Sequence, residues 1–351
     1  MIKINNGIKK TSGFSSNKFI LFVFIIVLCF SLFFISGCTP HSQGDSSHLR
    51  VGNVDYMTGT DGLSVSFVET IFPKEVYENE MFTVGFDIAN KGAYDINEGI
   101  ISVGVQKDYV DLPEKGFGWE NTKTTKREDN NNYLTLEMKG KSNEFPQGDK
   151  DIVVINMKAK GLDSKQGFHK STINLNTCYT YSSVTTQSVC IDSDPHNLLR
   201  RVKSCTIKPI SLTSQGGPVA ITKIETRMAI PDENTIKPEF TIYIQNKGKG
   251  LIVNPEKIKQ ACGIFNVSNP MNSSDFNRIS IDAKLEGASL RCEPVPLRIT
   301  SNRDYVRCSL ENGLERKDLH SADYSSYLTI NITYGYQFSV SKDFTLRSRF
   351  S

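Results

Sequence analysis

The chain has 351 residues, of which 38% are hydrophobic, and it carries 41 basic against 38 acidic side chains. Four of the lysines precede the apolar N-terminal segment, so the rest of the chain is close to neutral. A near-neutral body excludes nucleic-acid binding through a basic face, and the length suits two domains of about 150 residues each.

The first 37 residues have the pattern of a secretory signal, with lysines, an apolar run at 19–35 and then small residues. The sequence Ile-Ser-Gly before Cys38 resembles a lipobox, in which cleavage leaves the cysteine to carry lipid. The alternative is that residues 1–37 are an uncleaved membrane anchor. Residues 38–60 are then a tether, attached through lipid if Cys38 is modified. Both alternatives place the body at the cell membrane, on its outer face.

Residues 61–195 are predicted to form an immunoglobulin-like β-sandwich. The stretch FTVGFDIANKG at 82–92 has apolar side chains at every second position, which is the period of a strand. Asn-Lys-Gly then ends the strand, because Asn and Gly tolerate the positive φ of a tight turn. Short strands separated by turn signals are typical of such a sandwich. Further strands are expected at 63–70, 99–105, 133–139, 151–159, 171–181 and 184–191, with a polar loop at 111–132.

Residues 200–351 are predicted to form a second sandwich of the same kind, after a polar boundary at 192–197. Its main strand reads FTIYIQNKG at 240–248. One short helix is expected at 254–263, because Asn caps it, Pro occupies its first turn and Gly ends it. The other strands are expected at 203–212, 219–230, 278–285, 289–293, 296–300, 304–310, 326–334 and 337–347. The fold class predicted for the chain is therefore all-β, with two tandem sandwiches.

The two halves share motifs in the same order. The Asn-Lys-Gly strands are followed by TINLNTCYTY at 172–181 in the first half and by TINITYGY at 329–336 in the second. Two shared motifs in one order favour duplication of a single module.

The first half also contains LEMKGKSNEFPQGDKDIVV at 136–154, CYTY at 178–181 and VCID at 189–192. With the Asn-Lys-Gly strand, these motifs resemble those of cell-surface lipoproteins of small-genome archaea that carry tandem immunoglobulin-like modules of the CARDB kind. The resemblance covers residues 60–192 well and 205–350 loosely, and the second half lacks the closing cysteines. It implies a fold and a location more than an activity.

Six cysteines follow Cys38, and an even count in an exported body indicates three disulfides. Spacing favours pairing Cys178 with Cys190 and Cys292 with Cys308 across hairpins, which leaves Cys205 with Cys262. The alternative is a zinc site, which is disfavoured because the sequence has no Cys-x-x-Cys pair and its histidines are scattered. No metal or other cofactor is therefore expected.

Three sequons for N-glycosylation occur at Asn266, Asn272 and Asn331, all in the second half. The alternative is that these matches arise by chance. Asn331 alternates with isoleucines on a predicted strand, so its side chain is expected to point outward.

Two other groups of residues have alternative interpretations. Trp119, Phe117 and Tyr109 could contact a ligand from a loop, or fold back on the rim of the sheet. Asp192 and Asp194 could bind calcium at the domain junction, or cap a turn. In both cases the purely structural role is favoured.

The sequence contains no pattern that predicts catalysis, such as Gly-x-Ser-x-Gly or His-Glu-x-x-His. We therefore expect a non-enzymatic, membrane-anchored protein of the cell surface that acts in adhesion or binds an unknown protein or glycan partner. One alternative is an accessory subunit of an envelope assembly, such as a pilus or secretion complex, which would pair through an exposed strand edge. Another is a hydrolase whose site forms only in the fold.

Overall fold

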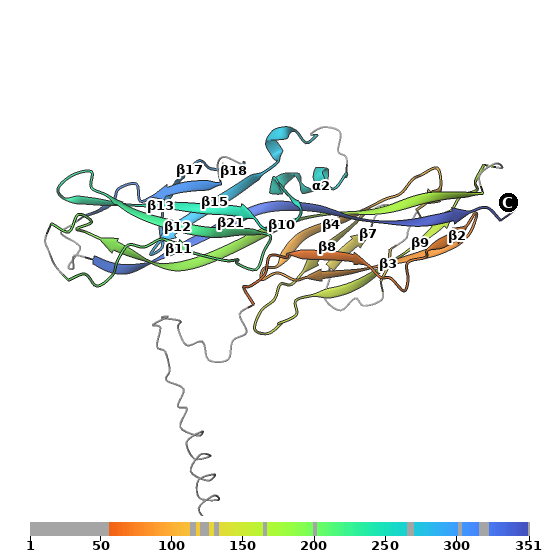
Figure 1. Ribbon diagram of the computed structural model, residues 1–351, viewed down its shortest axis with the longest axis horizontal. Helices are drawn as coiled ribbons and strands as arrows, with labels where there is room; N and C mark the ends of the chain where they lie inside the picture. Colours follow the sequence, from red (N-terminus) through yellow and green to blue (C-terminus); the bar gives the residue numbers. More distant parts are fainter. Residues whose placement is uncertain are drawn as a thin grey trace, which may run out of the picture. The chain divides into compact units, whose positions relative to one another are not determined.

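The computed structural model describes residues 56–112, 117–119, 126–129, 133–163, 167–198, 202–264, 270–300, 304–315 and 323–349. Contacts divide the chain into Met1–Gly52 and a second unit, Asn53–Ser351, to which all described residues belong. The described part consists almost entirely of strands packed in sheets (Figure 1), which confirms the predicted all-β fold class. None of the helices among the described residues is long and apolar enough to cross a membrane. Cys38, Asn266 and the predicted signal lie outside the described residues.

The described strands of the body form three sheets. Sheet A lies in the first half, sheet C in the second, and sheet B runs through both. Sheet A has the order β1 (Leu63–Phe67), β3 (Met81–Asn90), β9 (Lys150–Ala159) and β5 (Val110–Asp111), with β6 (Phe117–Trp119) also on β9. Sheet C has the order β11 (Ile210–Ser211), β12 (Val219–Ala229), β13 (Thr235–Asn246), β19 (Tyr305–Ser309) and β17 (Arg291–Glu293), with β20 (Leu314–Glu315) on β13.

Sheet B joins the halves. Its order is β16 (Ala288–Ser289), β15 (Arg278–Leu285), β21 (Asp323–Arg347), β10 (Phe168–Asp192), β4 (Ile96–Gly104), β8 (Tyr133–Met138) and β7 (Lys126–Asp129). Three short strands pair outside this order: β2 (Glu75–Tyr77) and β14 (Leu251–Val253) with β21, and β18 (Leu297–Arg298) with β15. Among the described residues, the helical turns are η1 (Pro255–Lys257), α2 (Ile258–Ala261) and η2 (Ser273–Asp275).

Strands β10 and β21 are each 25 residues long and pair antiparallel along their whole length, from Phe168 opposite Arg347 to Asp192 opposite Asp323. Figure 1 shows them side by side through both halves. The sequence predicted a break in each strand, at 182–183 and at 335–336, and both breaks are wrong. Nothing in the Ser-Ser pair at 182–183 requires a turn, and the alternation of buried side chains continues through it.

The last part of β21 belongs to the core of the first half. The ring of Phe344 lies 5.3 Å from that of Phe82 on β3, and β2 pairs in parallel with residues 345–347. In return, the end of β10 contacts the second half, where Ser183 Oγ donates to the carbonyl of Val219 at 3.2 Å. The domain ranges 61–195 and 200–351 stay a prediction, and any such division cuts through this shared sheet.

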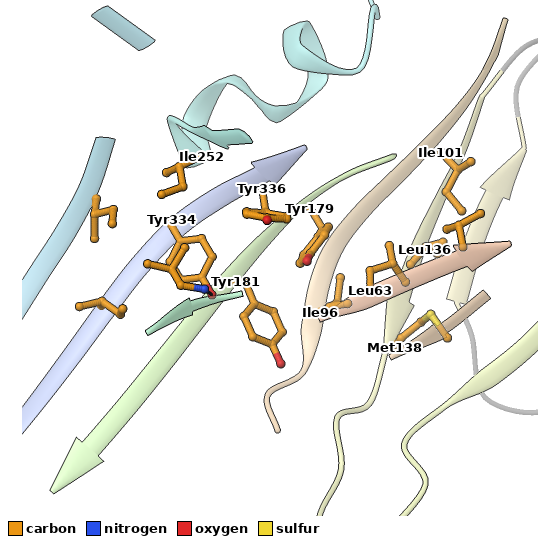
Figure 2. Packing of buried hydrophobic residues seen from close by; sticks show 14 of the residues in the cluster. Leu63, Ile96, Ile101, Leu136, Met138, Tyr179, Tyr181, Ile252, Tyr334 and Tyr336 are labelled. Carbon is orange, nitrogen blue, oxygen red and sulfur yellow. Dashed lines mark hydrogen bonds between the residues drawn. The ribbon is translucent and has the colours of Figure 1, made fainter. Parts of the chain in front are cut away.

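Four buried tyrosines meet where the two paired long strands pass from one half of the body to the other. Tyr179 lies opposite Tyr336, and Tyr181 lies opposite Tyr334, on either side of the pair formed by Thr180 and Gly335. Neighbouring rings in this tyrosine cluster have centroids 5.7–6.4 Å apart. Figure 2 shows the cluster between buried residues of both halves. Because the strands are antiparallel, the two Tyr-x-Tyr motifs are related by a local two-fold axis.

The first Asn-Lys-Gly turn docks on this tyrosine cluster. Asn90 closes the turn, since its Oδ1 accepts from the amide of Gly92 at 3.1 Å and its Nδ2 donates to the carbonyl of Tyr94 at 2.8 Å. The amide of Tyr94 then donates to the hydroxyl of Tyr181 at 3.1 Å. The turn that ends the strand therefore also anchors it to sheet B.

The second Asn-Lys-Gly turn makes the same set of contacts. Asn246 Oδ1 accepts from the amide of Gly248 at 3.2 Å, and its Nδ2 donates to the carbonyl of Gly250 at 2.8 Å. The amide of Gly250 donates to the hydroxyl of Tyr336 at 2.8 Å. The shared sequence motif thus corresponds to a shared structural role.

We expect Gly92→Ala to lower the free energy of unfolding by about 3 kcal/mol. A Cβ on Gly92 would collide with the hydroxyl of Tyr181 and would lie 2.6 Å from the carbonyl oxygen of Gly216. The control is Gly161→Ala, where the nearest atom, Nδ2 of Asn79, is 3.8 Å away and an effect within about 0.5 kcal/mol is expected. Equal midpoints of the two variants in urea would contradict the anchoring role of this turn.

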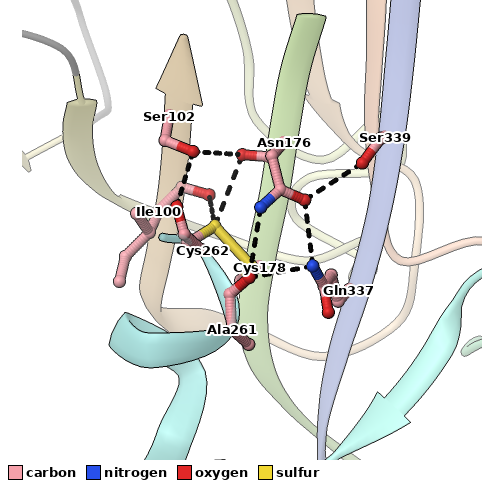
Figure 3. The surroundings of a disulfide bond; sticks show 8 residues. All are labelled: Ile100, Ser102, Asn176, Cys178, Ala261, Cys262, Gln337 and Ser339. Carbon is pink, nitrogen blue, oxygen red and sulfur yellow. Dashed lines mark hydrogen bonds between the residues drawn. A yellow bond between two sulfur atoms is a disulfide. The ribbon is translucent and has the colours of Figure 1, made fainter. Parts of the chain in front are cut away.

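The predicted short helix is confirmed as η1 followed by α2, with the Asn254 side chain accepting from the amide of Glu256 and Gly263 at a φ of +78°. This helix packs on sheet B next to Cys178. Because Cys178 directly precedes Tyr179 on β10, its side chain lies on the opposite face of the sheet from the tyrosine cluster. Cys178 bonds to Cys262 at the end of α2 (Figure 3).

The end of α2 is fixed by three strands of sheet B (Figure 3). The carbonyl of Ala261 accepts from Asn176 Nδ2 at 3.1 Å and from Gln337 Nε2 at 2.8 Å, and that of Cys262 accepts from Ser102 Oγ at 2.7 Å. These donors satisfy carbonyls that a helix end leaves without intrahelical partners. The helix of the second half is thereby attached to β4 and β10 of the first.

All six body cysteines form disulfides, but two of the predicted pairs are wrong. Cys178 bonds to Cys262 and Cys190 bonds to Cys205, while Cys292 bonds to Cys308 as predicted. Because Cys178 and Cys190 lie on one continuous strand, they are about 40 Å apart and cannot bond to each other.

Candidate functional site

The solvent-facing side of sheet C is the candidate site. On β13 and β19, apolar side chains at alternate positions are buried and the intervening polar ones face outward. The strand register places the outward residues in three rows across the sheet. These rows are Arg227, Glu239, Ser309 and Arg291; then Glu225, Thr241, Arg307 and Glu293; then Lys223, Tyr243 and Tyr305.

A groove of 1260 Å³ lies over this face. Thr241 and Ser309 are the small residues among the outward ones, and each lies between two long charged side chains of its row, Glu225 and Arg307 for Thr241 and Glu239 and Arg291 for Ser309. The surface is therefore lower at these two positions than around them. The groove is lined by outward residues of the four strands and by the flanking segments, which contribute Ile207, Pro209, Pro294, Val295 and Glu311.

A closed charge network lies beside the groove and reaches its wall at Glu225. Lys223 Nζ lies 2.5 Å from Glu225, and the hydroxyl of Tyr243 donates to the same carboxylate at 3.0 Å. The hydrogen bond from Lys223 is the main cause that lowers the pKa of Glu225 below its usual value. A carboxylate held ionised in this way is unsuited to act as a general acid.

The opposite wall contains a second network. The guanidinium of Arg291 lies 2.8 Å from both Glu293 and Glu311, and these carboxylates raise the pKa of Arg291. These side chains are exposed, so the ion pairs orient the wall and contribute little to stability.

Four charged residues of the groove are not part of these networks. Arg227, Lys237 and Glu239 have no ion pair within the part of the chain that the structure describes. Arg307 lies over the ring of Tyr305, with its guanidinium carbon 5.7 Å from the ring centroid. The groove can therefore offer three cationic groups, one carboxylate and an aromatic ring to a ligand.

The buried aspartates at the junction are satisfied within the protein. Asp192 Oδ2 lies 2.6 Å from Lys203 Nζ, and its Oδ1 accepts from the amide of Asp194. Asp194 in turn accepts from the amide of Leu198 at 2.8 Å. These contacts correspond to the turn-capping alternative, and no cluster of three or more metal-ligating side chains occurs among the described residues.

The structure does not bring the other predicted site residues together. Asn272 is exposed and caps η2, while Asn331 lies in the middle of sheet B between Val184 and Asp282. Tyr109 stacks on the ring of His169 at 3.6 Å. Trp119, expected in a loop, is at the end of strand β6, and its side chain is not described.

The groove was not predicted from the sequence. Its signal was visible as charged or hydroxyl residues at alternate positions on or just before the predicted strands, at 223, 225 and 227, at 237, 239 and 241, and at 307 and 309. This alternation marks a solvent-facing side, but it does not show which strands are neighbours, and only neighbouring strands form a common surface.

Comparisons with known proteins identify no family. No protein-family description and no curated protein matches the chain. Among solved structures, the collagen adhesin (CNA) of S. aureus matches with a TM-score of 0.20, 8% identity, and coverage of 84% of this chain and 93% of that one. The serine-rich repeat protein Srr2 of Streptococcus agalactiae matches with a TM-score of 0.19, 8% identity, and coverage of 81% and 91%. Likenesses at these TM-scores carry no argument about function.

Proposed function

We propose that the chain is a non-enzymatic, membrane-anchored protein of the outer cell surface that binds a partner through the groove on sheet C. The observation that carries this proposal is the groove itself, a wide hollow lined by charged, hydroxyl and aromatic side chains with both walls oriented by ion pairs. The three disulfides support an exported body, because such bonds persist in oxidising compartments.

Membrane attachment belongs to the same proposal and rests on the N-terminal pattern. Cleavage before Cys38 with lipid on its thiol would leave residues 38–60 as a tether between membrane and body. Of the two sequons within the described residues, Asn272 is the more accessible acceptor, since Asn331 lies inside a sheet. The intact mass of the exported protein, followed by peptide mapping, reports both modifications.

The binding proposal is tested by photo-crosslinking on cells that display the protein. A photo-reactive residue in place of Thr241, inside the groove, is expected to give a defined crosslinked species. The matched control replaces Thr186, an exposed threonine on sheet B that does not line the groove, and is expected to give none. Equal crosslinking from both positions, or none from Thr241, would overturn binding through sheet C. A stoichiometric membrane complex would favour the accessory-subunit alternative.

A further inference from the structure

The groove has more free positive than free negative charge. Its carboxylates Glu225, Glu293 and Glu311 are already held by Lys223 and Arg291. Arg227, Lys237 and Arg307 face only Glu239 as an unpaired carboxylate among the described residues lining the groove. An arriving anion therefore finds guanidinium and ammonium donors that need no internal ion pair to be broken.

The formal charges of the whole lining nevertheless balance, with four basic and four acidic side chains. A polymer with several negative charges on each unit would be repelled by the carboxylates on both walls. The ligand that fits is a chain with one anionic group on each unit and neutral polar groups beside it.

The positions of the two free arginines set that spacing. Arg227 is on β12 and Arg307 is on β19, with β13 between them, and their positions are offset by two residues along β13. At the usual strand spacing and rise, their Cα atoms are about 12 Å apart. The long arginine side chains can reach inward from these positions to acidic groups on neighbouring sugar rings of one chain.

The floor of the groove suits sugars better than a peptide. The hydroxyls of Thr241 and Ser309 can each donate and accept, as sugar hydroxyls require. The ring of Tyr305 supports the guanidinium of Arg307 that lies over it. Protein interfaces concentrate their energy in buried apolar anchors, whereas the large apolar residue that is exposed among those lining the groove is Val295 at the rim.

We infer that the partner bound by the groove is an acidic polysaccharide whose carboxylates are held by Arg227 and Arg307. The inference rests on the proposed function, because it assigns a ligand class to the same face. Lys237 supplies a third cationic contact, and Thr241 and Ser309 hydrogen-bond the sugar hydroxyls. Binding by charged groups at an open surface weakens as salt screens them.

The test compares three soluble polymers on the full-length protein in detergent: polygalacturonate, neutral dextran and poly-L-glutamate. Affinity is measured by biolayer interferometry at about 0.05 and 0.5 M salt. The double variant Arg227→Gln/Arg307→Gln removes the two guanidinium contacts. The matched control, Lys284→Gln/Arg298→Gln, removes two exposed cations that do not line the groove.

Polygalacturonate is expected to bind most tightly and to lose about tenfold or more in affinity in the groove variant but not in the control. Equal binding of dextran would overturn the requirement for acid, and equal binding of poly-L-glutamate would overturn the requirement for sugar. No binding to any polymer, while Thr241 still crosslinks on cells, would overturn the ligand class and leave the proposed function intact. Loss of both signals would overturn both.

Discussion

Deleting residues 338–351 is expected to unfold the first half of the body, although these residues are at the far end of the sequence. The deletion removes Phe344 and Leu346, which are buried in the first half, and the segment with which β2 pairs. Truncating a buried Phe or Leu costs about 2–5 kcal/mol each, and a domain has about 5–15 kcal/mol in total. Hydrogen exchange is therefore expected to show loss of protection in β3 and β9.

The control is a chain that ends at Arg349, which retains every described contact of β21. It is expected to keep the protection of the intact protein. If residues 61–195 formed an autonomous sandwich, the deletion would leave β3 and β9 protected and would expose only strands of the second half. Protected β3 and β9 amides would therefore contradict the shared sheet.

Removing the bond between Cys178 and Cys262 is expected to cost more stability than removing either of the other disulfides. The two cysteines are separated by 84 positions, against 15 for Cys190–Cys205. In the chain-entropy account, a longer loop restricts the unfolded chain more, which gives about 4–5 kcal/mol for the first bond and about 3 kcal/mol for the second. The first bond also holds α2 against sheet B.

The measurement is urea unfolding of two double variants, Cys178→Ala/Cys262→Ala and Cys190→Ala/Cys205→Ala. Peptide mapping of the oxidised parent under non-reducing conditions supplies the independent check. A peptide joining Cys178 to Cys190 would contradict the continuous strand β10, since that pair requires a hairpin. A larger destabilisation from the Cys190–Cys205 variant would contradict the stapling role of the bond to α2.

Local patterns predicted the elements well. The alternation in 82–92 and 240–248 gave strands with the expected buried faces, and the Asn-Pro start with Gly263 at the end gave the helix. The period of a strand and the chemistry of a cap both act between near neighbours in sequence, so they can be seen without knowledge of the fold.

The same reasoning failed at 182–183 and at 335–336. Whether the chain turns or continues as a strand at these positions depends on the neighbouring strand with which it pairs. For each long strand that neighbour is the other long strand, which is far away in sequence. Ser182 and Ser183 tolerate either conformation. The error carried over to the disulfides, because pairing Cys178 with Cys190 by spacing assumed a hairpin that does not exist.

The sequence by itself determined that the chain is all-β, that its cysteines suit an oxidising compartment, and that two similar strands end in Asn-Lys-Gly. Tertiary structure alone decided that both turns dock on one cluster of tyrosines across a shared sheet, which cysteines pair, and that the charged positions of β12, β13, β19 and β17 meet in one groove. The reason is physical. Periodicity fixes which way a side chain points along its own strand, whereas strand order and register, set by long-range packing, fix which other side chains stand beside it.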